Sequence, residues 1–329
     1  REAYPDATLI GVDTGYFADR KPGTILPSSS LPDVQYMVDI REMPRDILKD
    51  IDSVVHLAAI SNDPIGERYR EATYEINYRA TITLAESARS MGVQRFVFAS
   101  SCSVYGFVEE GVADEDHRLN PLTPYAYSKM RAEEALYGLA NDAFCVTCLR
   151  FATACGASDN LRLDLVLNDF VAHAVTKNEI LILSDGSPVR PLVHVQDMAR
   201  AIRWAIERDR DNGGPFFVTN VGRDGWNFRV RDLARHVSEV IPGVSVRING
   251  DGQPDRRSYS VSFERFKDAA PSFQPSVDLA GAIDGLYRQI VQLSFDNGDF
   301  RQSRYMRLVA LEALRKDGLL DDELRWRSV

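Results

Sequence analysis

The residues best suited to chemistry lie between positions 95 and 129. Phe96–Ala99 is a short apolar run, as expected of a strand buried on both faces of a parallel sheet. Small hydroxyl residues follow where this strand should end, namely Ser100, Ser101 and Ser103. In open α/β sheets the ligand crevice lies just past the carboxyl ends of the strands. We therefore expect these hydroxyls to lie beside a ligand.

A second group follows on a predicted helix that begins at Pro124. Tyr125 and Lys129 are four residues apart, so they share one helix face, whereas Tyr127 points elsewhere. A tyrosine pKa of about 10 is too high for a base at neutral pH, but a nearby ammonium favours the phenolate and lowers that pKa. Tyr125 could then take a proton from an alcohol whose carbon gives up hydride, while Ser101 hydrogen-bonds the same oxygen.

Length and charge limit the possible partners. At 329 residues the chain can bury a large core, as one big domain or two unequal ones. A net charge of −9 argues against nucleic acid or an anionic membrane as a partner. No apolar run approaches membrane-spanning length and no signal peptide is recognisable, so we expect a cytoplasmic protein.

The cysteines do not predict a metal site or a disulfide scaffold. Cys145 and Cys148 form a Cys-x-x-Cys, but they fall in a strand-like run, where residues three apart face opposite sides. His56 likewise lies inside a predicted strand, Ser53–Ala59, which favours a core histidine over a catalytic one. We expect structural roles for all three residues.

The start of the chain predicts half of a dinucleotide site. Residues 7–13 read as a strand that ends in Asp13. In a dinucleotide fold such an acid follows a Gly-rich turn by about twenty residues and binds the adenosine ribose. No such turn precedes Asp13, so we expect that the sequence begins late, with a strand, a glycine turn and a helix absent from its front.

Strands alternate with helices through the first half, which predicts a parallel, doubly wound sheet. Val34–Val38 is a strand, and Tyr74–Met91 is a long helix stopped by Gly92. The alternation loosens later, where Asp164–Val175 is helical and Ile180–Arg190 reads as a small hairpin. We divide the chain into a dinucleotide-binding domain (residues 1–155), a mainly substrate-binding lobe (156–296) and a helical extension (297–329). For the extension we favour folding back onto its own subunit over a helix that faces a partner.

Together these residues resemble the extended short-chain dehydrogenase/reductase family of NAD-dependent nucleotide-sugar epimerases and dehydratases. The resemblance runs from about Ala7 to about Leu293. It rests on the following motifs: Asp13, Asp39-Ile40, His56-Leu-Ala-Ala59, Asn77, Ser100-Ser-Cys-Ser-Val-Tyr-Gly106, Tyr125-x-x-x-Lys129, Leu149-Arg150, Gly186-x-x-x-Arg190, His194-Val-x-Asp197 and Asn220-Val-Gly222. It implies a Rossmann-type sheet with a smaller α/β lobe for substrate.

The resemblance also implies roles for individual residues. The catalytic residues would be Tyr125, Lys129 and Ser101. The cofactor would be held by Asp13, Asp39, Ile40, Leu57, Ala58, Ala59, Asn77, Ala99, Tyr125, Lys129 and Phe151. A nucleotide sugar would be held by Ser101, Cys102, Ser103, Thr153, Asn168, Arg190, Arg256 and Arg257, the last three suiting a diphosphate. NAD is favoured over NADP because Asp13 would repel the additional phosphate, and a homodimer through the helices from Tyr74 and Tyr125 is expected.

Departures from the family narrow the reaction. The 4,6-dehydratases carry Asp-Glu directly after the catalytic hydroxyl, where this chain has Cys102 and Ser103, so we do not expect dehydration. Thr153 replaces the usual Asn, which puts that substrate contact in question. We expect hydride transfer at sugar C4, by an epimerase or alternatively by a C4-ketoreductase that uses external NAD(P)H. The Tyr-Lys pair argues against a third possibility, a non-catalytic dinucleotide-binding regulator.

Overall fold

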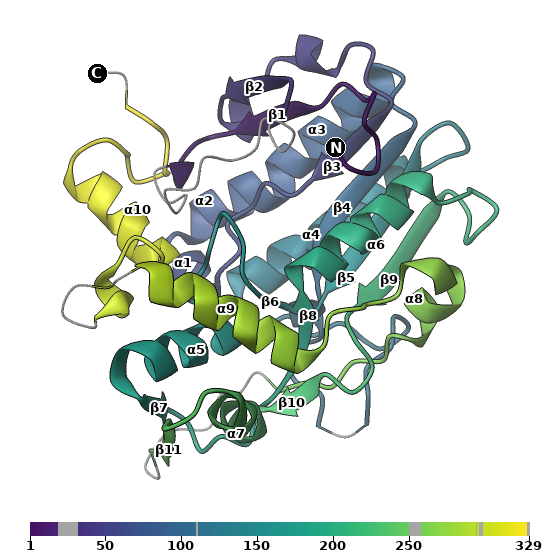
Figure 1. The fold of residues 1–329 in the computed structure, drawn as a ribbon. Helices are drawn as coiled ribbons and strands as arrows, with labels where there is room; N and C mark the ends of the chain where they lie inside the picture. Colours follow the sequence, from purple (N-terminus) through teal and green to yellow (C-terminus); the bar gives the residue numbers. More distant parts are fainter. Residues whose placement is uncertain (19–31, 110, 250–257, 294, 296–298, 328–329) are drawn as a thin grey trace.

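The computed structural model describes residues 1–18, 32–109, 111–249, 258–293, 295 and 299–327. Its largest sheet is parallel, with strand order β3-β4-β5-β9. These strands are β3 (Ser53–His56), β4 (Arg95–Ser101), β5 (Cys145–Phe151) and β9 (Phe216–Val221). Helices lie on both faces of this sheet (Figure 1), so the predicted doubly wound α/β fold is confirmed.

Side-chain alternation along β4 divides the core between the two faces. Phe96 and Phe98 pack with residues of α3 (Ala80–Ser90) and α4 (Pro124–Leu139). Val97 lies in the other cluster, with Trp204 of α6 (Val195–Glu207). All three strand residues are at most 1% exposed. A strand buried on both faces has no solvent side, which is why this run is continuously apolar.

Two further strands form a separate parallel pair. β1 (Ile10–Asp13) pairs with β2 (Val34–Met37), with Asp13 opposite Met37. Among the described residues no backbone pairing joins β1 to β3, so the break in the sheet lies between the strand ending at Asp13 and the strand beginning at Ser53.

The long helix predicted from Tyr74 to Met91 is confirmed and starts earlier. It is continuous through α2 (Arg70–Tyr74), a π-helical turn (Glu75–Arg79) and α3. Gly92 follows with φ 84°, a conformation that favours glycine after a helix. The short α1 (Asp63–Arg68) precedes this helix, capped by the Asn62 side chain.

The smaller lobe has two short sheets, β10-β8-β6 and β11-β7. Its strands are β6 (Thr153–Cys155), β7 (Glu179–Ile182), β8 (Val189–His194), β10 (Asn227–Arg229) and β11 (Ser245–Ile248). Its main helices are α5 (Val166–Lys177), α7 (Val230–Val240) and α9 (Leu279–Leu293), with α8 (Glu264–Ala269) beside β9.

The hairpin predicted over Ile180–Arg190 is wrong. β7 pairs in parallel with β11, and β8 pairs with β6 and β10 instead of with β7. Ile180 and Ile182 are buried in the lobe core beside α5 and α7, and that burial draws β7 away from β8. Apolar alternation predicts a strand but not its partner, because the partner depends on contacts distant in sequence.

The C-terminal extension folds back onto its own chain, as predicted. α10 (Arg307–Lys316) lies against α1 (Figure 1), and Leu311 is fully buried in a cluster with Ile65 and Tyr69. Leu320 and Leu324 of the following segment join the same cluster.

All four cysteines are buried and free, and His56 is a core residue whose pKa burial lowers to about 3. In the described part of the chain no group of His, Cys, Asp or Glu could hold a metal. Within the same ranges no helix is long and apolar enough to cross a membrane.

Gly156 lies just after β6, where the chain enters the smaller lobe, and it packs closely against His194. Its φ is 110°, and a Cβ there would lie 2.2 Å from His194 Nε2. We expect Gly156→Ala to lower the free energy of unfolding by about 3 kcal/mol, from backbone strain plus overpacking. Gly92→Ala has a positive φ (84°) but no atom within 4 Å of the added Cβ, so it should cost about 1 kcal/mol. Urea unfolding of both variants measures the difference, and equal losses would contradict the steric argument.

Candidate active site

The structure brings Ser101 and Tyr125 together. Ser101 is the last residue of β4, and Tyr125 lies in the first turn of α4. Pro124 begins that helix, and the Thr123 hydroxyl caps it by accepting a hydrogen bond from the Ala126 N–H at 3.2 Å. The Ser101 side chain lies near the Tyr125 phenol and lowers its pKa against the effect of burial. The structure therefore places both side chains at the carboxyl end of β4, and their catalytic roles stay a prediction.

Lys129, one helical turn further along α4, is tied to the strand. Its ammonium donates to the carbonyl oxygen of Ala99 at 2.7 Å and lies 4.6 Å from the centre of the Phe98 ring. The side chain is buried, and burial lowers the pKa of Lys129 to about 7, although the negative charge of Glu133 raises it.

The expected effect of Lys129 on the phenol is wrong for this structure. Burial raises the pKa of Tyr125 to about 12. The neighbouring Ser101 side chain and the charge of Arg162 lower this pKa, and the charge of Asp63 raises it further. Lys129 Nζ lies 5.9 Å from the centre of the Tyr125 ring and points at a backbone carbonyl. Desolvation disfavours phenolate and ammonium alike, so the helical spacing alone does not create an acidic tyrosine.

The site also contains a buried ion pair between Arg150 and Glu133, which the sequence pattern did not predict. Arg150 of β5 donates from Nε and Nη2 to the carboxylate of Glu133, with a shortest distance of 2.7 Å and both side chains at most 6% exposed. The Ser100 hydroxyl donates to the same carboxylate. Glu133 follows Tyr125 and Lys129 on α4 at the same spacing of four, which is the signal that could have revealed it.

The loop after β3 and the second lobe contribute further polar residues that were missed. The Ser61 hydroxyl accepts hydrogen bonds from Arg162 at 3.1 Å and from Arg307 of α10 at 2.9 Å. Arg162 also pairs with Asp164, whose pKa the charge of Arg162 lowers against the effect of burial. These residues are distant in sequence, so only the fold brings them together.

The residues predicted for the ribose side of a dinucleotide lie at strand ends. Asp13 is exposed, and its carboxylate accepts a hydrogen bond from the Gly15 N–H at 2.6 Å. After β3, Leu57 is 56% exposed and Ala58 and Ala59 are half-buried. An accessible carboxylate fits a ribose, and small or exposed apolar residues fit the flat ring of a nucleotide. Ala99 is half-buried in β4, and Phe151 is buried at the end of β5.

Other predicted cofactor residues already have protein partners. The Asn77 side chain is buried, with its amide bonded to the N–H and carbonyl of Ile60 and to the Ser128 hydroxyl. Asp39 caps the short 3-10 helix Ile40–Glu42 and forms an ion pair with Arg41 at 2.6 Å. Asn77 thus holds the loop after β3 from within the core.

The predicted substrate residues are more scattered than expected. Ser103 has a buried hydroxyl with no partner among the described residues, and Thr153 is half-buried at the start of β6. Cys102 is 1% exposed and its sulfur donates to the carbonyl of Arg150, so burial removes it from the candidate contacts. The Asn168 amide is buried and bonds Gly156 and Arg162.

Arg190 is partly buried in β8 and donates to the carbonyl of Val189 at 2.9 Å. Arg256 and Arg257 lie outside the described residues.

The burial of Lys129 predicts a pH-dependent stability. Its pKa is about 7 in the folded chain and 10.5 as an unperturbed side chain, so between these values the unfolded chain binds more protons. The free energy of unfolding should therefore rise with pH from about 7 to about 10 more steeply than in Lys129→Met. Urea unfolding at several pH values checks this. Parallel pH profiles would mean that Lys129 keeps its ordinary pKa.

Comparisons with known proteins agree with this geometry. The family model "NAD dependent epimerase/dehydratase family" matches residues 33–222, which is more than half of the chain. A UDP-glucose 4-epimerase from Rhizobium meliloti is 29% identical over 292 residues, covering 80% of this chain and 83% of its own. A dTDP-glucose 4,6-dehydratase from Streptomyces griseus is 30% identical over 288 residues, covering 86% and 84%.

A solved structure has the same fold. MoeE5, in complex with UDP-glucose and NAD, aligns with a TM-score of 0.69 and 25% identity over 88% of this chain and 100% of its own. The chain therefore belongs to the NAD-dependent epimerase/dehydratase family, whose members act on nucleotide sugars.

Proposed function

We propose that this chain is a nucleotide-sugar 4-epimerase in which Tyr125 exchanges the proton of the C4 hydroxyl. The observation that carries the proposal is the position of Tyr125 beside Ser101 at the carboxyl end of β4. Both hydroxyls can contact one substrate oxygen there. The relatives named UDP-glucose 4-epimerase support this choice of reaction.

The chain's own residues divide the work. Tyr125 gives or takes the hydroxyl proton, and Ser101 orients the same oxygen. Burial raises the pKa of Tyr125 to about 12, so the phenol must lose its proton before it can take the proton of the C4 hydroxyl, and it returns that proton when the hydride returns. When its amine is protonated, Lys129 places a positive charge near the Tyr125 ring. NAD, when bound, accepts and returns the hydride.

We assign the adenosine end of NAD to Asp13, Asp39 and Ile40, and its nicotinamide end to the neighbourhood of Tyr125 and Lys129. Asp13 suits the ribose because its carboxylate is exposed at the end of β1. Leu57, Ala58 and Ala59 line the path between the two ends. The nucleotide sugar would lie toward Ser103 and Thr153, with Arg190 near its diphosphate.

Dehydration is disfavoured because Cys102 and Ser103 occupy the positions where the dehydratases carry Asp-Glu. Cys102 is buried, and burial raises the pKa of its thiol. A thiol held protonated in the core cannot serve a departing hydroxyl in the crevice. The similarity to a dTDP-glucose 4,6-dehydratase therefore reflects a shared fold more than a shared elimination of water.

The reaction is tested with UDP- and dTDP-hexoses deuterated at C4, followed by NMR and mass spectrometry. An epimerase yields the C4 epimer with the deuterium retained and no net consumption of NADH. Stoichiometric consumption of NADH with a 4-keto sugar would instead identify the C4-ketoreductase. A product lighter by one water would overturn both and identify a dehydratase.

Tyr125→Phe should lower kcat about a hundredfold or more, the usual effect of losing a general acid–base group. Tyr127→Phe, on the same helix but 45% exposed, is the matched control and should keep the wild-type rate. Steady-state kinetics with the turned-over substrate measures both variants. An active Tyr125→Phe enzyme would contradict the assigned role.

The expected homodimer through the helices that contain Tyr74 and Tyr125 remains a prediction. The rings of Tyr74 and Tyr127 lie 6.5 Å apart across these helices, and Tyr127 is accessible. Exposed aromatic side chains on adjoining helices are common in protein interfaces. Sedimentation measurements would establish the oligomeric state.

A further inference from the structure

The last described segment, Leu319–Arg327, forms a small self-contained hairpin. Leu320 and Trp326 face each other as an antiparallel bridge, and the Arg327 N–H donates to the Leu319 carbonyl at 2.9 Å. At its turn the Asp321 carboxylate accepts from the N–H groups of Glu323 and Arg325 at 2.9 and 2.8 Å. Gly318, with φ 74°, separates the hairpin from α10. Movement of the hairpin about this glycine has to break the bond from the Leu319 N–H to the Leu314 carbonyl and the Arg315–Asp322 ion pair, which join it to α10.

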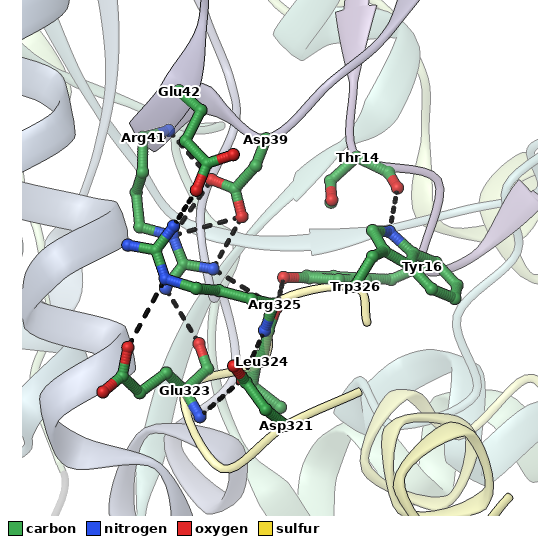
Figure 2. A network of polar contacts seen from close by, with 10 residues as sticks. All are labelled: Thr14, Tyr16, Asp39, Arg41, Glu42, Asp321, Glu323, Leu324, Arg325 and Trp326. Carbon is green, nitrogen blue, oxygen red and sulfur yellow. Dashed lines mark hydrogen bonds and ion pairs between the residues drawn. The ribbon is translucent and has the colours of Figure 1, made fainter. Parts of the chain in front are cut away.

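The hairpin lies on the residues assigned to the adenosine end of the cofactor (Figure 2). Arg41 donates to the carbonyl oxygens of Glu323 and Leu324 at 2.8 and 3.2 Å. The same guanidinium binds both carboxylate oxygens of Asp39. As a result the side chains of Arg41 and Asp39 are only 5% and 12% exposed.

Apolar contacts reinforce this position. Leu324 is fully buried in a cluster with Tyr16 and Ile60, and Ile40 packs against that cluster. The Tyr16 hydroxyl donates to the Leu324 carbonyl (Figure 2). Leu324 has φ 58°, a left-handed conformation that a leucine rarely adopts.

The hairpin also reaches the loop that follows Asp13. The indole N–H of Trp326 donates to the Thr14 carbonyl at 2.6 Å, and Arg325 forms an ion pair with Glu42 (Figure 2). Asp13 itself stays exposed. The ribose contact is thus open, whereas Asp39 and Ile40, assigned to adenine, are half-buried.

We propose that this hairpin is an autoinhibitory element that occupies the adenine end of the dinucleotide site and competes with NAD. The inference rests on the proposed assignment of Asp39 and Ile40 to adenine. Arg41, held by the hairpin carbonyls, occupies the Asp39 carboxylate, and Ile40 packs against the cluster that contains Leu324, so both residues are engaged by other protein groups while the hairpin is docked. Binding of NAD requires the hairpin to swing away about Gly318. By linkage, NAD and the docked hairpin weaken each other by the same factor.

Leu324→Asp tests the competition, because a carboxylate in this apolar cluster expels the hairpin. The dissociation constant for NAD, measured by isothermal titration calorimetry, should fall at least about tenfold, since the apparent constant is divided by the fraction of open molecules. Leu319→Asp is the matched control, because Leu319 is 36% exposed in the same segment, and it should bind NAD as the wild type does. Unchanged or weaker NAD binding by Leu324→Asp would overturn the proposal.

Limited trypsin digestion of the unaltered chain gives an independent test that needs no variant. Saturating NAD should speed cleavage after Arg325 by about tenfold, because it shifts the hairpin to its undocked state. Protection or an unchanged rate would contradict competition. If NAD binds, but Leu324→Asp has the wild-type dissociation constant and NAD leaves the cleavage rate unchanged, only the autoinhibition proposal fails. If neither the wild type nor Leu324→Asp binds NAD, the proposed function fails with it.

Discussion

The candidate site depends on how α4 is fixed to β4. The ammonium of Lys129 bonds the Ala99 carbonyl within the strand, and Glu133, one turn later, bonds the Ser100 hydroxyl and Arg150 of the neighbouring strand. Buried charges are costly to leave unpaired, so these contacts hold the helix in a single position. That position sets Tyr125 against Ser101.

The same burial explains the electrostatics of the site. Lys129 and Tyr125 are both desolvated, so each is shifted toward its neutral form, with pKa values of about 7 and about 12. Charges from outside α4 act on the phenol, namely Asp63 from the start of α1 and Arg162 from the second lobe. The properties of Tyr125 therefore belong to the assembled cleft, and the Tyr-x-x-x-Lys motif supplies only two of its parts.

The C-terminal extension packs against the N-terminal part of the chain. α10 places Arg307 beside Arg162 at Ser61, and the hairpin beyond it covers Asp39 through Arg41. Asp39, which we propose to hold the cofactor, thus acquires an additional set of contacts within this chain. A segment that packs on a binding site through few apolar anchors is well suited to respond to the ligand of that site.

Local pattern determined the elements of this protein, and tertiary contact determined their chemistry. Phe96–Ala99 predicted a doubly buried strand, Pro124 a helix start, and the spacing of Tyr125 and Lys129 their shared face, because side-chain periodicity and proline geometry are local properties. The sequence could not predict that β7 pairs with β11 or that Cys102 is buried. Nor could it predict that Arg41, the ion-pair partner of Asp39, donates a hydrogen bond to the Leu324 carbonyl. Strand partners, burial and pKa shifts arise from groups far apart in the chain, so only the folded structure decides them.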